Sequence, residues 1–236
     1  MRYKAFATDF DGTIAHDGVV PDHVINALRR LKESGVKLVM VSGRELTDLL
    51  NIFPHADVFD LMVLENGALL YDPKQQHTKL LAPAPPEQLV ERLQKLNIPL
   101  SVGHSVVATV EPHEHAVLDA IRDLRLEWHV IFNKGNVMCL PAGVTKATGL
   151  CPALEQLGIK PEEIVAAGDA ENDHALLQMA GFAVAPANAL DSVKEDADLV
   201  TAGKRGDGIA EMIDLWLGEG LPEPRRHVAT AINPLT

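Results

Sequence analysis

The chain has 236 residues, and its 21 Lys and Arg residues against 33 Asp and Glu residues give a formal net charge of −12. The length suits one large or two modest domains. Hydrophobic residues at 47% and charged residues at 23% exclude a disordered or collagen-like chain. The acidic balance argues against nucleic acid as a partner, because such binding depends on Lys and Arg at the phosphates. An anionic substrate would therefore need cations placed locally.

The targeting and cysteine patterns predict a cytoplasmic protein that does not enter a membrane. The apolar stretch that ends at Asp9 is too short for a signal peptide. The longest uncharged stretch, 175–190, is shorter than the roughly 20 residues of a membrane span. Cys139 and Cys151 have no metal-ligand spacing, so we expect both to be buried, inert thiols.

In the first third of the chain, short apolar runs alternate with segments of helical period, which is typical of a parallel sheet with crossover helices. Strands are predicted at 5–10, 37–41 and 61–64, and helices from Pro21 to a cap at Gly35 and at 45–52. Asn66-Gly67 between apolar flanks predicts a hairpin.

The middle of the chain has a different pattern. After a proline-rich joint at 82–86, helices are predicted at 87–96 and 115–124, and strands at 100–102, 106–111, 128–132 and 136–140. A helix followed by two strands, written twice, is typical of a small α+β module. We therefore predict that a core of residues 1–81 and 142–236 is interrupted by an inserted domain of residues 82–141.

Strand–helix alternation resumes after the insert. Helices are predicted at 145–157, 173–179 and 208–217, strands at 164–167 and 182–184, and a surface tail at 218–236. The predicted fold class is α/β.

Four short motifs carry the candidate chemistry, and the first, Asp9-Phe10-Asp11-Gly12-Thr13, follows the first strand. Alternation along a strand turns Asp9 and Asp11 towards the same region. Paired carboxylates at this spacing suit a nucleophile and a general acid/base. A polar loop that caps a helix is the alternative for this pentapeptide taken alone.

The second and third motifs offer anion-binding groups. Ser42-Gly43-Arg44 follows the second strand and precedes a helix, where a hydroxyl and free backbone N–H groups suit an anion. Thr145 is a predicted N-cap, which leaves Lys146 on the first helical turn, where its charge opposes the helix dipole. That unfavourable placement favours an anion nearby.

The fourth motif, Gly168 to Asp173, follows the strand at 164–167, and open α/β sheets bind ligands at such strand ends. If this strand neighbours the first, Asp9, Asp11, Asp169 and Asp173 converge. Like charges ~4 Å apart repel by about 4 kcal/mol at an effective dielectric of 20, so the cluster calls for a divalent cation. Oxygen ligands beside a phosphate favour Mg²⁺ over zinc.

The four motifs, in this order, resemble the haloacid dehalogenase superfamily from Tyr3 to about Leu217. The place of the insert, between Ser42 and Lys146, is similar to that in the Cof-type, or subfamily IIB, sugar phosphatases and in archaeal-type phosphoglycolate phosphatases with a C2-type cap. The resemblance implies a Rossmann-like core and a Mg²⁺-dependent phosphatase that hydrolyses a small phosphate monoester. It leaves the physiological ester open, and a monomer or homodimer is expected.

The resemblance also implies roles for single residues. Asp9 would form an aspartyl-phosphate and Asp11 would be the general acid/base. The implied substrate-binding residues are Ser42, Gly43, Arg44, Lys146 and Asn172, and the implied Mg²⁺ ligands are Asp9, Asp11 through its backbone carbonyl, Asp169 and Asp173.

Two further functions stay open from the sequence. A phosphomutase or phosphotransferase would pass the acyl-phosphate to a sugar hydroxyl, and a non-catalytic receiver-like switch would also use an acceptor Asp, a Lys and acidic Mg²⁺ ligands. Asp11 argues against the switch, because a carboxylate placed to activate water shortens the life of the acyl-phosphate.

The sequence departs from the family pattern at two positions. Ala147 stands where relatives often carry glycine, and His174 stands where they often carry an apolar residue.

Overall fold

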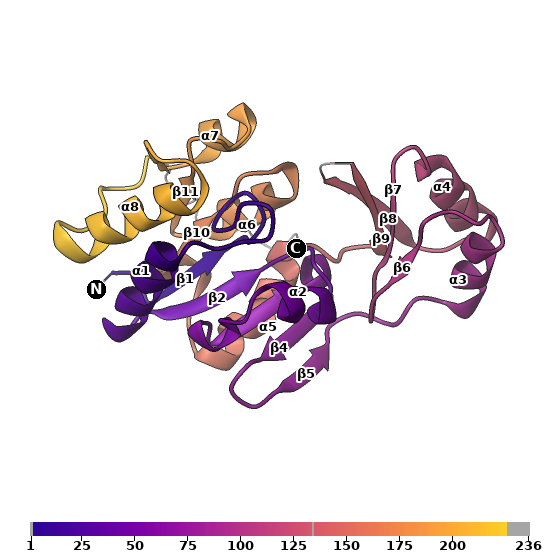
Figure 1. Ribbon diagram of the computed structural model, residues 1–236, viewed down its shortest axis with the longest axis horizontal. Helices are drawn as coiled ribbons and strands as arrows, with labels where there is room; N and C mark the ends of the chain where they lie inside the picture. The colour runs from indigo at the N-terminus through magenta and orange to yellow at the C-terminus, as the bar shows by residue number, and fades with distance from the viewer. Residues whose placement is uncertain (1, 134, 226–236) are drawn as a thin grey trace, which may run out of the picture.

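The computed structural model describes residues 2–133 and 135–225, and an eight-stranded sheet forms its core (Figure 1). The strand order is β12-β11-β10-β1-β2-β3-β4-β5. The bounds are β1 (Ala5–Thr8), β2 (Lys37–Val41), β3 (Leu61–Leu64), β4 (Leu69–Asp72), β5 (His77–Leu80), β10 (Ile164–Ala167), β11 (Phe182–Ala185) and β12 (Leu199–Val200). Neighbours from β12 to β3 are parallel, and β3–β4 and β4–β5 are antiparallel.

Helices cover both faces of this sheet, which explains why its central strands are continuous apolar runs. One face packs against α1 (Asp22–Glu33), α2 (Leu46–Ile52) and α8 (Arg205–Gly218). The opposite face packs against α5 (Lys146–Leu157), α6 (His174–Met179) and α7 (Asp191–Asp196). Within β1, Phe6 faces the first group, and Ala5 and Ala7 face the second. The architecture is the predicted α/β class.

A second sheet, β6-β7-β9-β8, is antiparallel and lies apart from the first (Figure 1). Its strands are β6 (Ser101–Val102), β7 (Val107–Val110), β8 (Trp128–Asn133) and β9 (Asn136–Pro141). Helices α3 (Glu87–Gln94) and α4 (Glu114–Asp123) pack on one face through Leu89, Leu93 and Val117. On the other face, Met138 and Leu140 join a small apolar cluster with Ala68 of the core. We use "inserted unit" for residues 82–141, whose exact limits remain a prediction.

Single 3₁₀ turns complete the fold: η1 (Ala56–Val58), η2 (Glu65–Gly67), η3 (Pro161–Glu163) and η4 (Glu171–Asp173). Turn η2 joins β3 to β4, so the hairpin predicted at Asn66-Gly67 is confirmed. Within the described part of the chain, we find no helix with the length and apolar character needed to span a bilayer.

Several predictions need correction. The first strand ends at Thr8 and not at Phe10, because the chain turns after the Asp9 amide donates to Ala167 O. Cys139 is buried as expected, but Cys151 is exposed and its thiol donates to Ala147 O at 3.5 Å. Of the predicted tail, 226–236 lies outside the described residues, whereas Leu221 packs against the core.

Candidate active site

The site lies at the carboxyl edge of the parallel strands, where β1 is flanked by β10 and β2. Asp9 follows β1, Ser42 follows β2 and Asp169 follows β10. The connection from β1 to β2 runs through α1 on one face, and the connection from β10 to β11 runs through α6 on the other. This is a topological switch point, the usual place for a ligand in an open α/β sheet.

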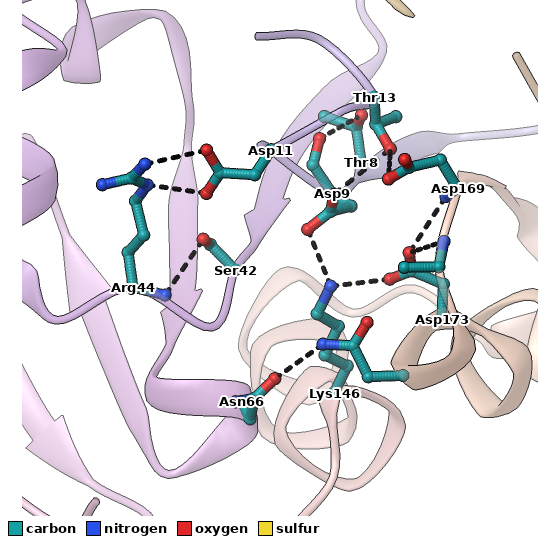
Figure 2. A network of polar contacts seen from close by, with 12 residues as sticks. Thr8, Asp9, Asp11, Thr13, Ser42, Arg44, Asn66, Lys146, Asp169 and Asp173 are labelled. Carbon is teal, nitrogen blue, oxygen red and sulfur yellow. Dashed lines mark hydrogen bonds and ion pairs between the residues drawn. The ribbon is translucent and has the colours of Figure 1, made fainter. Parts of the chain in front are cut away.

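Lys146 links two carboxylates at the centre of the site (Figure 2). Its ammonium lies 2.7 Å from Asp9 Oδ1 and 2.7 Å from Asp173 Oδ1, and its side chain is only 2% exposed. Thr145 is the N-cap of α5, as predicted, and its side chain accepts a hydrogen bond from the Thr148 amide. The cap fixes the first turn and therefore the position from which Lys146 reaches both acids.

The buried charges act on one another. Burial, together with the negative charges of Asp173 and Asp169, raises the pKa of Asp9 to about 7 against the opposing effect of Lys146. Burial works to lower the pKa of Lys146, but Asp173 and Asp9 outweigh it, so that pKa is raised. Lys146 is therefore a permanent cation, and the carboxylates around it are in excess.

Asp9, Asp169 and Asp173 form a candidate metal centre. All three are buried, and one carboxylate oxygen from each lies within 4.8 Å of the others. The three carboxylates against one Lys146 ammonium leave an excess negative charge that a divalent cation would neutralise. Oxygen-only donors suit a hard cation such as Mg²⁺. The residues present thus fit the expected metal.

Backbone geometry orients Asp173 within this group. Its Oδ2 accepts hydrogen bonds from the Asp169 and Ala170 amides, each at 3.0 Å, which leaves Oδ1 for Lys146. A Cβ at Gly168 would lie 2.4 Å from Asp173 Cβ, so only glycine leaves room for this turn. Thr13, which we had not assigned a role, places its hydroxyl 3.2 Å from both Asp9 Oδ2 and Asp169 Oδ1.

Asp11 points to Arg44 and not to Asp9 (Figure 2). Arg44 Nε and Nη2 donate to its two carboxylate oxygens at 2.6 and 2.9 Å. The same guanidinium donates to Asp48 and lies over the Phe10 ring, 5.7 Å from its centroid. Arg44, expected at the substrate, is thus engaged with acids of the core.

The remaining expected residues line the approach to Asp9. Ser42 is buried, and its Oγ accepts a hydrogen bond from the Arg44 amide at 3.2 Å. Gly43 lies beneath Asn66, whose amide nitrogen would be 3.1 Å from a Cβ there. Asn172 Nδ2 donates to Asn66 Oδ1 at 3.0 Å, and Asn172 Oδ1 is buried with no partner among the described residues.

Two cavities lie between the core and the inserted unit. One, of about 490 Å³, is lined by Asp9, Asp11 and Arg44 of the core and by Ser101, Asn133 and Asn136 of the inserted unit. The other, of about 650 Å³, is lined by Lys146, Asn172 and the wall formed by 130–132. Both fall within the usual size range of small-molecule sites. Met138 Sδ accepts a hydrogen bond from Asn66 at 3.0 Å, a contribution of the inserted unit that we had not foreseen.

Comparison with known proteins decides the family. The model of the haloacid dehalogenase-like hydrolases matches residues 6–117 and 115–213. The chain belongs to this family. The family expected from the four motifs is thereby confirmed, and the two matched ranges together cover all of the insert and most of the core.

Relatives of this haloacid dehalogenase-like hydrolase extend the comparison. Phosphoglycolate phosphatase of Methanothermobacter thermautotrophicus is 29% identical over 231 residues, which cover 91% of this chain and 99% of that protein. The 5-amino-6-(5-phospho-D-ribitylamino)uracil phosphatase YcsE of Bacillus subtilis is 27% identical over 238 residues, 91% of this chain and 96% of that protein. A solved sugar phosphatase of subclass IIB has the same fold, with a TM-score of 0.73 at 21% identity over 90% of this chain and 98% of that one.

Proposed function

We propose that this haloacid dehalogenase-like hydrolase is a Mg²⁺-dependent phosphatase that hydrolyses a small phosphate monoester through an aspartyl-phosphate on Asp9. The observation that carries the proposal is the buried group at the switch point, in which Lys146 lies between Asp9 and Asp173 and Asp169 is adjacent. The phosphatase names of the full-length relatives support the reaction type.

In the proposed reaction, an Asp9 oxygen attacks phosphorus and the bond from phosphorus to the leaving oxygen breaks. Asp11 donates its proton to the leaving alkoxide. Asp11 then removes a proton from water, which attacks phosphorus and frees Asp9 and inorganic phosphate. Lys146 and the backbone N–H groups after Ser42 stabilise charge on the equatorial oxygens.

The proposed Mg²⁺ ligands are the Asp9, Asp169 and Asp173 carboxylates and the Asp11 backbone carbonyl. When bound, the ion screens the repulsion between the Asp9 carboxylate and an anionic phosphoryl group. The role proposed for Asp11 requires its side chain to exchange Arg44 for the leaving oxygen, because in the structure both of its carboxylate oxygens accept from Arg44.

We propose a hydroxyl-rich leaving group, as in a sugar phosphate. The inserted unit supplies neutral polar side chains to the smaller cavity, namely Ser101, Asn133 and Asn136. Arg44 is the one cation among the described residues that line it, and it already pairs with Asp11 and Asp48. Among the described residues of this lining, a carboxylate-bearing ester such as phosphoglycolate finds no unpaired cation, whereas sugar hydroxyls find donors and acceptors. Residues 82–141 would thus act as a cap that selects the substrate.

The test is hydrolysis by the purified protein. We expect release of p-nitrophenol from p-nitrophenyl phosphate with Mg²⁺ and none with EDTA. Asp9→Asn should lower the rate by more than about 10³-fold, since it removes the nucleophile. Asp191→Asn, an exposed carboxylate whose side chain is 96% accessible, is the control and should keep the full rate. An undiminished rate in Asp9→Asn would contradict the mechanism.

A panel of phosphate esters then separates the remaining possibilities. Faster hydrolysis of hexose phosphates than of phosphoglycolate supports the proposed leaving group, and the reverse order contradicts it. Transfer to added sugars in excess of hydrolysis would identify a phosphotransferase. A long-lived phosphoprotein after treatment with acetyl phosphate would identify a switch.

A further inference from the structure

Glu65 is fully buried, and its carboxylate is not part of the candidate metal centre formed by Asp9, Asp169 and Asp173. It is in η2 of the core, between β3 and β4, and its backbone has φ 51°. The left-handed region is unfavourable for a residue with a side chain, and so is a buried charge. Both costs require compensating contacts.

The contacts that satisfy the Glu65 carboxylate come, among the described residues, from the inserted unit. Glu65 Oε2 accepts hydrogen bonds from the Ser105 amide at 2.8 Å and the Val106 amide at 3.2 Å. Its Oε1 accepts from the His104 amide at 3.0 Å, and His104 Nδ1 lies at the same distance. A Cβ at Gly103 would lie 2.9 Å from the carboxylate, so glycine at that position allows the approach. The Glu65 side chain of the core thus binds the turn between β6 and β7.

The residues after Glu65 connect this contact to the active site. Asn66 bonds to Asn172, beside Asp173, and to Met138 of the inserted unit. Gly67 lies against α5, where a Cβ would come within 2.0 Å of Thr145 O, one residue before Lys146. The tripeptide Glu65-Asn66-Gly67 therefore contacts the inserted unit, η4 and the helix α5 that carries Lys146.

We propose that Glu65 is a positioning residue that holds the inserted unit docked over Asp9 and Asp11, so that the unit's polar side chains meet the leaving group at a fixed distance. This role rests on the proposed function, because it matters for catalysis only if the inserted unit contacts the substrate. Undocking would break together the hydrogen bonds that the Glu65 carboxylate accepts from the His104, Ser105 and Val106 amides. The docked arrangement is therefore favoured, and the two cavities between the core and the inserted unit leave a route for the substrate.

Amide exchange tests the docking contact without reference to activity. The His104, Ser105 and Val106 amides donate to Glu65, so Glu65→Gln, which replaces one acceptor oxygen by a donor, should speed their hydrogen exchange by about tenfold. Gly103→Ala should do the same from the other side of the contact. Glu87→Gln, an exposed glutamate of the same unit, is the control and should change nothing. Unchanged protection in both test variants would overturn the proposal.

Kinetics test the positioning role. With the preferred ester, Glu65→Gln should raise KM by about tenfold, because hydrogen bonds to charged groups contribute on that scale. With acetyl phosphate, whose small leaving group does not reach the inserted unit, kcat/KM should stay within about twofold of the wild-type value. An equal loss with both substrates would overturn the positioning role. If the wild-type protein hydrolyses neither substrate, the proposed function fails, and the exchange experiment still decides the docking contact.

Discussion

Lys146 is a cation enclosed by protein, and its two carboxylate partners make that burial tolerable. The charge that opposes the α5 dipole had indicated an anion nearby, and the structure supplies Asp9 and Asp173. The residues next to Lys146 in sequence do not identify these partners, because Asp9 follows β1 and Asp173 lies in η4. The same side chain serves the fold and, in the proposed reaction, the transferred phosphoryl group.

Lys146→Met should therefore impair stability and activity together. Removing one partner of a buried ion pair leaves uncompensated charge, so we expect a loss of about 4 kcal/mol of unfolding free energy. Urea denaturation measures it. Lys160→Met is the matched control, because Lys160 lies 4.0 Å from Glu162 with 75% of its side chain exposed, and it should cost less than about 0.5 kcal/mol. Equal stability of the two variants would show that the Lys146 pairs are not formed.

The two thiols should differ in reactivity, which reverses our expectation for Cys151. Burial raises the pKa of Cys139 to about 12, and the thiolate is the reactive form. Cys151 is exposed on α5. Iodoacetamide at mildly alkaline pH should label Cys151 in the folded protein and Cys139 only after denaturation, as measured by peptide mass. Labelling of the folded Cys151→Ser variant would contradict the burial of Cys139.

The sequence predicted the site residues that directly follow strands, and it missed contacts between residues that are far apart in the chain. Asp9, Ser42 and Asp169 were found because each follows an apolar run. Arg44 was found too, but not its pairing with Asp11. Glu65 and Met138 were missed, because their roles arise only when the inserted unit docks against the core.

Among the elements, α5 makes an unusually close approach to η2, where two glycines face each other. A Cβ at Gly149 would lie 2.3 Å from Gly67 Cα and 2.5 Å from Gly67 O. Glycine in mid-helix is normally unfavourable. Here the absence of both side chains lets the helix that begins at Lys146 lie against the hairpin turn.

Gly149→Ala should consequently destabilise the protein by about 2 kcal/mol, because overpacking outweighs the gain in helix propensity. It should also lower kcat, since α5 positions Lys146. Gly218→Ala is the control, because beyond its chain neighbours and its own helix backbone no described atom lies within 4 Å of its Cβ position, and it should be neutral or stabilising by less than about 1 kcal/mol. Thermal unfolding compares them. Similar melting temperatures for the two variants would refute the close approach.

The sequence predicted correctly those strands that are buried on both faces of the sheet, and it missed elements that are exposed or very short. Strands β2, β3 and β10 have the predicted bounds, and each is almost wholly buried. β5 was missed because all four of its residues are exposed at the sheet edge. β12 has two residues and α7 has six, too few to establish a period.

At the scale of the whole molecule, metal and fold should be linked. Asp9 and Asp169 follow different strands and Asp173 lies in η4, so an ion bound to all three joins distant segments of the core. A ligand that binds only the folded state stabilises by about 2.7 kcal/mol at roughly 100 times its Kd.

Adding MgCl₂ to the metal-free protein should accordingly raise its melting temperature by several degrees in a concentration-dependent way. Asp169→Asn removes one charged ligand and should abolish most of that shift, whereas the exposed Asp191→Asn should keep it. Differential scanning fluorimetry measures all three. A shift of the same size in Asp169→Asn would place the ion elsewhere.

The position of β1 between β2 and β10 also sets the order in which strands can pair during synthesis. Ala5 pairs with Lys37 on one side and with Ile164 on the other, so one edge of β1 stays open until most of the chain has emerged. The strands of the second sheet pair among themselves and are complete at Pro141. The second sheet can therefore form before β1 has both of its neighbours, and Asp9 meets Asp169 only after β10 has paired with β1. Prematurely released chains would carry a finished middle section, an open strand edge and no active site.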